Sequence, residues 1–281
     1  MIRKARELLL STGLDRAGDR QRIAVLRRLV GRDEEWIAAL PPALAQAEWT
    51  TAVLTRALVR IGEVEPVCAD DVRDLVVGDR EALLLELRRS LFGDSIECVL
   101  ACPSRSCSES LSLGLVVDEL LQKPPDDTAA AVHDICIGAA GVVRFRLPTG
   151  ADQEVAARAS DVARGVRELM DRCVLSADHG SLTSRDVRDL GRAMRERDPQ
   201  AELRLALDCH ACGHEFQTTF DTGAFLAAEI RAHAVRLLDE IHVLASTYHW
   251  SEGEILSLDP DRRRRYVARI ARATAREGVW S

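Results

Sequence analysis

The chain has 281 residues, of which 45 are acidic and 38 are basic, so its formal net charge is −7. With 47% hydrophobic and 30% charged residues, the composition is typical of a soluble globular protein of one or two domains. The negative charge and an aromatic content of 4% argue against a dedicated nucleic-acid-binding protein, which usually has a basic surface and stacking side chains.

The eight cysteines are the feature of the composition that most needs an explanation. They are too few for a disulfide scaffold, and no apolar run near the N-terminus is long enough for a signal peptide. No uncharged apolar run reaches the length of about 18 residues that a membrane span requires. We therefore expect a cytoplasmic protein without a membrane span, in which paired cysteines favour a metal site over a disulfide.

Residues 1–94 are predicted to form a mostly helical N-terminal region. Leucines recur at helical spacing between Asp79, a preferred N-cap residue, and Gly93, a preferred terminating residue. The segment 36–61 is rich in alanine and leucine and is also expected to be helical, with an interruption at Pro41 and Pro42.

The period of the apolar residues then changes from helical to alternating. Alternation over 96–100 and again over 111–115 predicts two strands that flank Cys102 and Cys107. A further pair of strands is expected over 135–147, and helices are expected over 152–175 and 184–197.

The last third of the chain repeats the pattern of two strands around a cysteine pair. Alternation over 203–207 leads into Cys209 and Cys212, and a strand carrying Phe216 and Phe220 follows. The remainder is expected to be helical: a long helix over 224–248, a short one after the capping box at Ser251, and one that begins at Asp259 and Pro260. Residues 102–121 and 209–230 therefore form a degenerate internal repeat of cysteine pair, strand and helix.

The two cysteine pairs have the spacing of metal ligands. A structural zinc ion takes four tetrahedral thiolate or imidazole ligands. Cys209 and Cys212 are followed by Gly213, which permits the dihedral angles of a tight turn, and Cys102 and Cys107 form a looser version with two more residues. We predict one closed zinc site with Cys102, Cys107, Cys209 and Cys212 as ligands, in which the two hairpins form a zinc ribbon.

Other ligands are conceivable for this site. Cys98 could replace Cys102 or Cys107, although a small buried strand residue is the preferred interpretation of Cys98, and His210 and His214 are alternative ligands. The remaining cysteines lack a partner at ligand spacing and are expected in the core: Cys68, Cys136 and Cys173.

The sequence gives little support to catalysis. A thioredoxin-like redox role for Cys209 and Cys212 is disfavoured because a strand, not a helix, is expected after them. The chain has no zinc-protease motif, P-loop, nucleophile elbow or dinucleotide-binding glycine motif. His242 and His249 lie on one face of a helix but are interpreted as ordinary, partly buried side chains. Four cysteines also leave a zinc ion no open position, so we expect no enzymatic activity.

Four consecutive arginines near the C-terminus are a candidate interaction surface: Arg262, Arg263, Arg264 and Arg265. They could contact nucleic acid, but in a chain of charge −7 we favour arginines that face solvent, pair with Asp259 and Asp261, or contact a protein. Tyr248 and Trp250 could pack at a helix corner or anchor a partner, since such residues are frequent at interaction hot spots.

Several segments, in this order, resemble signatures of the T4-type phage baseplate protein family. They are 78–89, 92–94, 102–103, 146–152, 209–214, 240–245, 248–256 and 263–266. The family includes hub and hub-assembly proteins and relatives in phage-like contractile injection systems of bacteria. The resemblance covers about residues 75–270. It departs from the family pattern at the first knuckle, which is longer and has Ser108 in place of glycine.

The resemblance implies a non-enzymatic baseplate hub component or baseplate assembly factor, whose partners are other baseplate, hub or spike proteins of the tail. We expect an α+β fold in which helices dominate. The second expected region is 95–281, with ribbon halves at 95–121 and 201–230. Because one zinc ion would join distant segments, the regions could form one interlocked unit. The alternative function is a zinc-ribbon regulator that binds nucleic acid.

Overall fold

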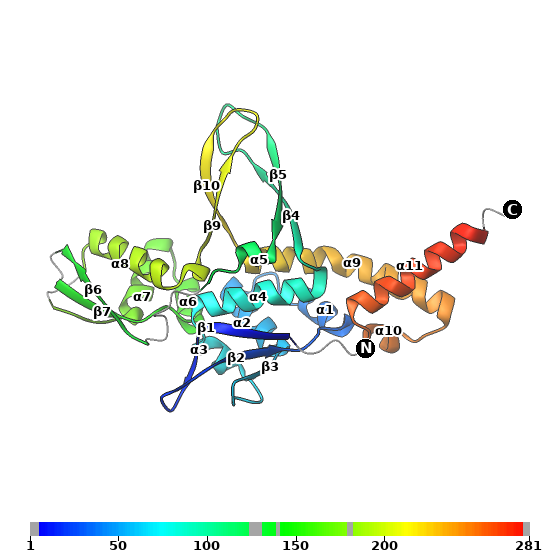
Figure 1. Cartoon of the computed structure of the whole chain (residues 1–281), viewed down its shortest axis with the longest axis horizontal. Helices are drawn as coiled ribbons and strands as arrows, with labels where there is room; N and C mark the ends of the chain where they lie inside the picture. The colour runs from blue at the N-terminus through cyan, green and yellow to red at the C-terminus, as the bar shows by residue number, and fades with distance from the viewer. Residues whose placement is uncertain (1–5, 124–130, 139–140, 179–181, 278–281) are drawn as a thin grey trace.

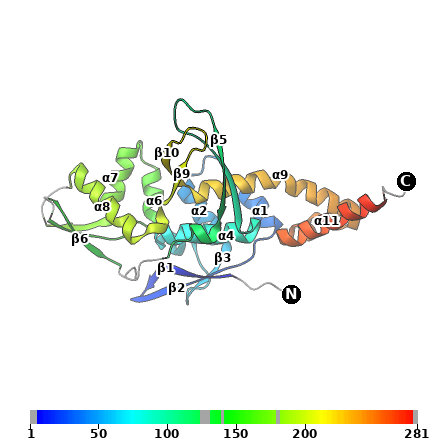
Figure 2. The ribbon, with the colours of Figure 1, turned by 45° about the horizontal axis from the view of Figure 1, so that its top comes forward.

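The structure, a computed structural model, describes residues 6–123, 131–138, 141–178 and 182–277. Within these segments helices dominate and the strands form small antiparallel sheets, so the fold is mixed α/β (Figure 1). No helix in the described part of the chain combines the length and the apolar character needed to cross a membrane. A helical body carries two hairpins that project from it, a lobe at one end and a helical arm at the other (Figures 1 and 2).

The N-terminal region begins with a sheet, so the prediction that it is mostly helical is wrong for its first residues. The strands of this antiparallel sheet, in the order β1-β2-β3, are β1 (Arg6–Arg16), β2 (Asp19–Leu26) and β3 (Leu58–Ile61). Leu10 and Leu14 are both buried and lie four residues apart, which imitates helical spacing. A bulge causes this spacing, because β1 advances from Leu9 to Leu14 while β2 advances only from Ile23 to Gln21.

Helices cover this sheet and form the largest core with it. Apart from α9, they come from the first third of the chain: α1 (Gly31–Ala38), α2 (Gln46–Ala57), α3 (Ala69–Asp74), α4 (Val77–Phe92) and α9 (Thr222–Tyr248). Leu83, Leu84 and Leu87 of α4 pack in the same apolar cluster as Leu226 and Ile230 of α9. The core therefore draws on both regions expected from the sequence.

The first turn of α4, residues 77–80, is buried and binds to distant parts of the chain. The carboxylate of Asp79 accepts hydrogen bonds from the backbone N–H groups of Ser11, Thr12 and Gly13, at 2.6, 3.1 and 2.7 Å. These N–H groups lie in the bulge of β1, where they have no ladder partner, so Asp79 satisfies them. The N–H of Gly78 donates to the carboxylate of Asp198 at 2.9 Å.

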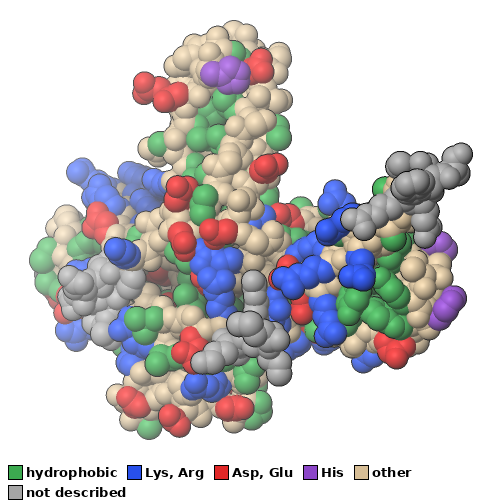
Figure 3. Space-filling model, turned by 45° about the vertical axis from the view of Figure 1, so that its right-hand side comes forward, with side chains coloured by type: hydrophobic (Ala, Val, Ile, Leu, Met, Phe, Trp, Pro, Cys, Tyr) green, Lys and Arg blue, Asp and Glu red, His purple; other side chains and the backbone are tan. Residues whose placement is uncertain are grey.

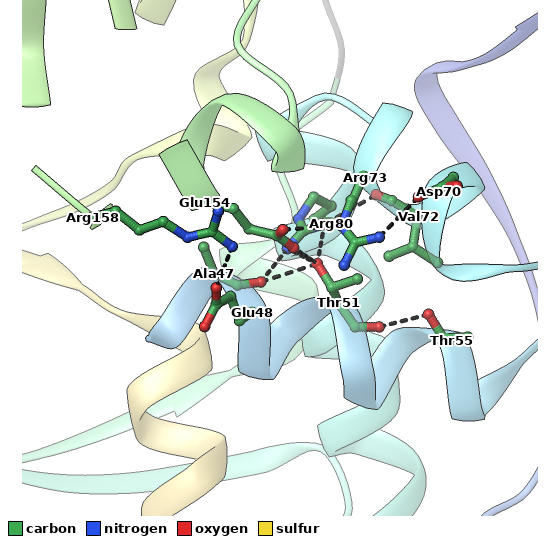
Figure 4. Close-up of polar contacts among 10 residues, drawn as sticks. All are labelled: Ala47, Glu48, Thr51, Thr55, Asp70, Val72, Arg73, Arg80, Glu154 and Arg158. Atoms are coloured by element: carbon green, nitrogen blue, oxygen red, sulfur yellow. Dashed lines mark hydrogen bonds and ion pairs between the residues drawn. The ribbon is translucent and has the colours of Figure 1, made fainter. Parts of the chain in front are cut away.

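Arg80 extends this network into α2 and α3 (Figure 4). Its guanidinium is fully buried and donates to the carbonyl oxygens of Ala47 and Val72 at 2.8 and 3.0 Å, and to the hydroxyl of Thr51 at 3.1 Å. Thr51 in turn donates to Glu154 of α6 (Gly150–Ala157) at 2.6 Å. Arg80 thus forms hydrogen bonds with two helices, α2 and α3, and is linked to α6 through Thr51.

The segment 146–152 packs directly against this turn. The N–H of Val77 donates to the carbonyl of Pro148 at 3.0 Å, and the N–H of Gly150 donates to the carbonyl of Leu75 at 3.0 Å. Thr149 caps α6 in a capping box with Asp152. The segments 78–89 and 146–152, which both resemble family signatures, therefore lie next to each other in a buried contact.

The lobe consists of a small sheet covered by helices. Its strands are β6 (His133–Ile137), β7 (Gly141–Phe145) and β8 (Val174–Ala177), and its longer helices are α7 (Val162–Cys173) and α8 (Ser184–Arg197). The strands expected over 135–147 are confirmed. The helix expected over 152–175 is divided into α6 and α7, and the chain continues from α7 directly into β8.

The two hairpins and the helices after them confirm the predicted internal repeat. The hairpins are β4 (Ser95–Ala101) with β5 (Ser110–Val116), and β9 (Leu203–Asp208) with β10 (Glu215–Phe220); they lie side by side in both views (Figures 1 and 2). The helix α5 (Val117–Leu120) follows the first hairpin, and α9 follows the second. At their base Ile96 and Leu203 pack with Leu85 of α4, so both hairpins are rooted on the same helix.

The C-terminal arm consists of the end of α9 with α10 (Glu252–Leu256) and α11 (Pro260–Glu277), which agrees with the predicted helices and with the capping box at Ser251. A buried ion-pair network holds α11 to the body. The fully buried guanidinium of Arg263 donates to Glu34 of α1 and to Glu240 of α9, both at 2.8 Å. Arg263 was predicted as part of the interaction surface of residues 262–265. It is instead fully buried, where it holds α11 to α1 and α9.

We predict that Gly150→Ala destabilises the protein. A Cβ at this position would lie 2.0 Å from Nη1 of Arg80, whose guanidinium is held on several sides. We expect the free energy of unfolding to fall by about 1–3 kcal/mol in urea titrations. Gly191→Ala in α8 is the matched control, because its nearest neighbour would be 3.8 Å away; it should leave stability unchanged or raise it. Equal losses in the two variants would contradict the packing described.

We also predict a pH-dependent effect of Asp198→Asn. Burial, assisted by the nearby Asp79, raises the pKa of Asp198 to about 7 although the N–H of Gly78 acts against it. The folded protein therefore holds a proton that the unfolded chain releases near pH 4, and wild-type stability falls as the pH rises from about 4 to 7.

The amide that replaces this carboxyl group has no such titration, so the variant should gain stability relative to the wild type over this range, by on the order of 3 kcal/mol. Urea titrations at a series of pH values measure the difference between the two proteins. Asp171→Asn, at an exposed position of α7, is the control and should give a constant difference. A constant difference for Asp198→Asn as well would contradict the assignment.

Candidate metal centre

Four cysteines from the two hairpins meet near the tips of the hairpins. The Sγ atoms of Cys102, Cys107, Cys209 and Cys212 all lie within 4.8 Å of one another. Cys102 and Cys212 are 3.8 Å apart, and so are Cys107 and Cys209. Each of these pairs joins one hairpin to the other, across 110 and 102 residues of sequence. The four thiols are free, with no disulfide between them.

Each of the two turns that carry the cysteines is closed by a backbone hydrogen bond. At the second turn, the N–H of Gly213 donates to the carbonyl of Cys209 at 2.8 Å, and Gly213 has a φ of +69°, which a residue with a Cβ rarely adopts. At the first turn, the N–H of Cys107 donates to the carbonyl of Ser104 at 2.9 Å. The longer first turn therefore closes without a glycine.

The four thiols differ in their exposure to solvent, and backbone N–H groups donate hydrogen bonds to one of them. Cys209 and Cys102 are buried, Cys107 is half-buried and Cys212 is exposed. Backbone N–H groups of Cys212 and Ala211 donate toward Cys209 and lower its pKa to about 7, so this thiol ionises more readily than an ordinary cysteine. Leu111 and Phe216 pack against the cluster.

The geometry fits a tetrahedral metal ion with thiolate ligands. Zn–S bonds of about 2.3 Å in a tetrahedron place neighbouring sulfurs roughly 3.8 Å apart, which is the separation of the two measured pairs. Four sulfurs would complete the coordination of such an ion, so the site offers no position for substrate or water.

The alternative ligands lie outside this group of four. Cys98 is half-buried within β4, and neither His210 nor His214 belongs to the cluster. The ring of His210 is 67% exposed and lies 3.8 Å from Glu109. Cys173 is buried as expected, but Cys68 and Cys136 are exposed, so their prediction as core residues is wrong.

Residues of the predicted interaction surface occur in two different environments. Tyr248, Trp250 and Tyr266 form a half-buried aromatic cluster with ring centroids 4.9–5.7 Å apart. Arg262 and Arg265 are exposed, whereas Arg264 is half-buried and pairs with Asp261 at 2.8 Å. His242 and His249, expected to be partly buried, are both exposed.

Arg269 and Arg272 were not predicted from the sequence as part of the interaction surface, although they share the face of Arg262 and Arg265. Helical spacing in the printed sequence was the available signal, because positions 262, 265, 269 and 272 lie three or four residues apart.

Comparison with known proteins yields one family. The model of the family described as T4 bacteriophage base plate protein matches residues 61–227, which is more than half of the chain. The match includes both hairpins and all four clustered cysteines. No curated protein and no solved structure is significantly similar to the chain.

Proposed function

Because the chain belongs to the T4 bacteriophage base plate protein family, we propose that it is a non-enzymatic baseplate hub component or baseplate assembly factor of a contractile phage tail or a phage-like injection system. Its role is to bind other baseplate, hub or spike proteins. The family match supports this proposal, and it gives no support to a nucleic-acid-binding regulator.

The proposal includes a structural zinc ion bound by Cys102, Cys107, Cys209 and Cys212. The single observation that carries it is the mutual distance of the four Sγ atoms, all within 4.8 Å. The ion would join the tips of two hairpins whose cysteines are about a hundred residues apart in sequence. It would thereby make the two expected ribbon halves, 95–121 and 201–230, one rigid projection.

We predict that the purified protein contains one equivalent of zinc and that Cys209→Ser loses it. Chelation should lower the free energy of unfolding by on the order of 4 kcal/mol, comparable with opening a cross-linked loop of about 100 residues. Elemental analysis and urea titration with and without chelator measure the two effects. Cys98→Ser is the matched control and should keep its zinc, because Cys98 lies outside the cluster.

A second readout covers the case in which Cys209→Ser does not fold. Cobalt bound by wild-type protein after removal of the native metal should give the absorption of a tetrahedral thiolate complex. Folded wild-type protein that contains no metal and takes up no cobalt would contradict the zinc site.

We expect the protein to retain tail proteins when it is expressed with its neighbouring genes. Affinity purification of the tagged full chain, followed by mass spectrometry, should recover hub, spike or other baseplate proteins that an untagged control does not. Recovery of nucleic acid without tail proteins would contradict the proposed role. Zinc content is measured on the same sample, so loss of the metal and loss of partners are scored separately.

A further inference from the structure

One face of α11 is a row of exposed arginines. They occupy positions three or four residues apart and line a hollow of about 610 Å³, together with Tyr266 and Ala273: Arg262, Arg265, Arg269 and Arg272. At a rise of about 1.5 Å per residue, the row is roughly 15 Å long. Figure 3 shows basic side chains gathered beside an apolar patch on the C-terminal arm.

These arginines differ from their neighbours because none of them has an ion-pair partner among the residues that the structure describes. Arg263 and Arg264 form ion pairs with Glu34, Glu240 and Asp261. Within the described part of the chain, no ion pair involves the side chain of any arginine in the row, and residues 262–275 contain neither Asp nor Glu. The helix therefore uses some arginines for its own attachment and presents the others to solvent.

We propose that this arginine row is a docking site for an acidic helix of a partner protein. The inference rests on the proposed function, which requires protein partners, and it specifies the chemistry of one of them. Carboxylates at helical spacing would match the arginines along the row, and the planar guanidinium binds a carboxylate through two parallel hydrogen bonds.

The aromatic residues beside the row give the docking site an apolar end. Tyr266 belongs to the cluster with Tyr248 and Trp250, and the guanidinium of Arg262 lies 6.0 Å from the centre of the Tyr266 ring. Half-buried aromatic rings next to arginines are the residue types enriched at protein interaction hot spots. An amphipathic acidic helix would place its apolar side chains against these rings.

Charge and length favour a helix over nucleic acid as the occupant. A DNA duplex that followed the row would extend beyond it, because the row is only roughly 15 Å long. The phosphates beyond the row would approach a protein whose total charge is −7 and would be repelled. A short acidic helix can end where the row ends.

The test uses the full-length protein loaded with zinc and three probes. The first is a helical peptide with glutamates on one face at the spacing of the arginines and leucines beside them. The second has the same composition with the glutamates distributed around the helix, and the third is a short DNA duplex. Binding is measured at physiological salt with the wild type, with Arg265→Glu/Arg269→Glu, and with Arg185→Glu/Arg188→Glu. The last variant makes the same charge change at exposed positions of α8.

We expect the first peptide to bind the wild type and the α8 variant equally, and to bind the α11 variant about tenfold more weakly. The second peptide and the duplex should bind the wild type more weakly than the first peptide. Three results would overturn the proposal: equal binding of both peptides, tighter binding of the duplex, or self-association of the wild type that the α11 substitutions abolish. Because zinc content and recovery of tail proteins are measured separately, such a result leaves the proposed function standing.

Discussion

The buried first turn of α4 is the contact on which the other parts of the structure depend. Its side chains and backbone satisfy polar groups of β1, α2, α3 and the end of α8 in a volume closed to water. Such groups are costly to bury without partners, so each of these segments is stable in its position only while α4 is present. The fully buried Arg80 makes this dependence strong, since burial lowers its pKa to about 10 and its hydrogen bonds must offset the cost of a desolvated charge.

The two ends of α4 also determine where the two hairpins begin. The first hairpin starts just after the C-terminal end of α4, at Ser95, and the second starts at Leu203, shortly after Asp198 binds the N-terminal end of the same helix. Their bases therefore have a fixed separation, and the cysteines bring their tips together. In the proposed baseplate role, the hairpins and the C-terminal arm are separate projections from one helical body.

The sequence predicted the features that depend on local spacing. Period-two alternation identified both hairpins, and the cysteine pairs identified the thiols that the structure brings together. It did not predict β1, because a bulge gives Leu10 and Leu14 the spacing of a helix. Nor did it separate Arg263 from its neighbours, since the run of arginines does not reveal which side chain meets Glu34, 229 residues away. Asp198 had no local signal either, because its partner Gly78 is 120 residues distant.

The separation of the two cysteine pairs in sequence has a consequence for synthesis of the protein. Cys209 leaves the ribosome 102 residues after Cys107. At about 5–20 residues per second, the first pair waits on the order of 5–20 s before the second pair exists. During that interval the nascent chain carries two thiols that cannot complete a tetrahedral site. For the proposed zinc site to form, Cys102 and Cys107 must therefore remain reduced while the lobe is translated, and the two hairpins can be joined only after the second one has been synthesised.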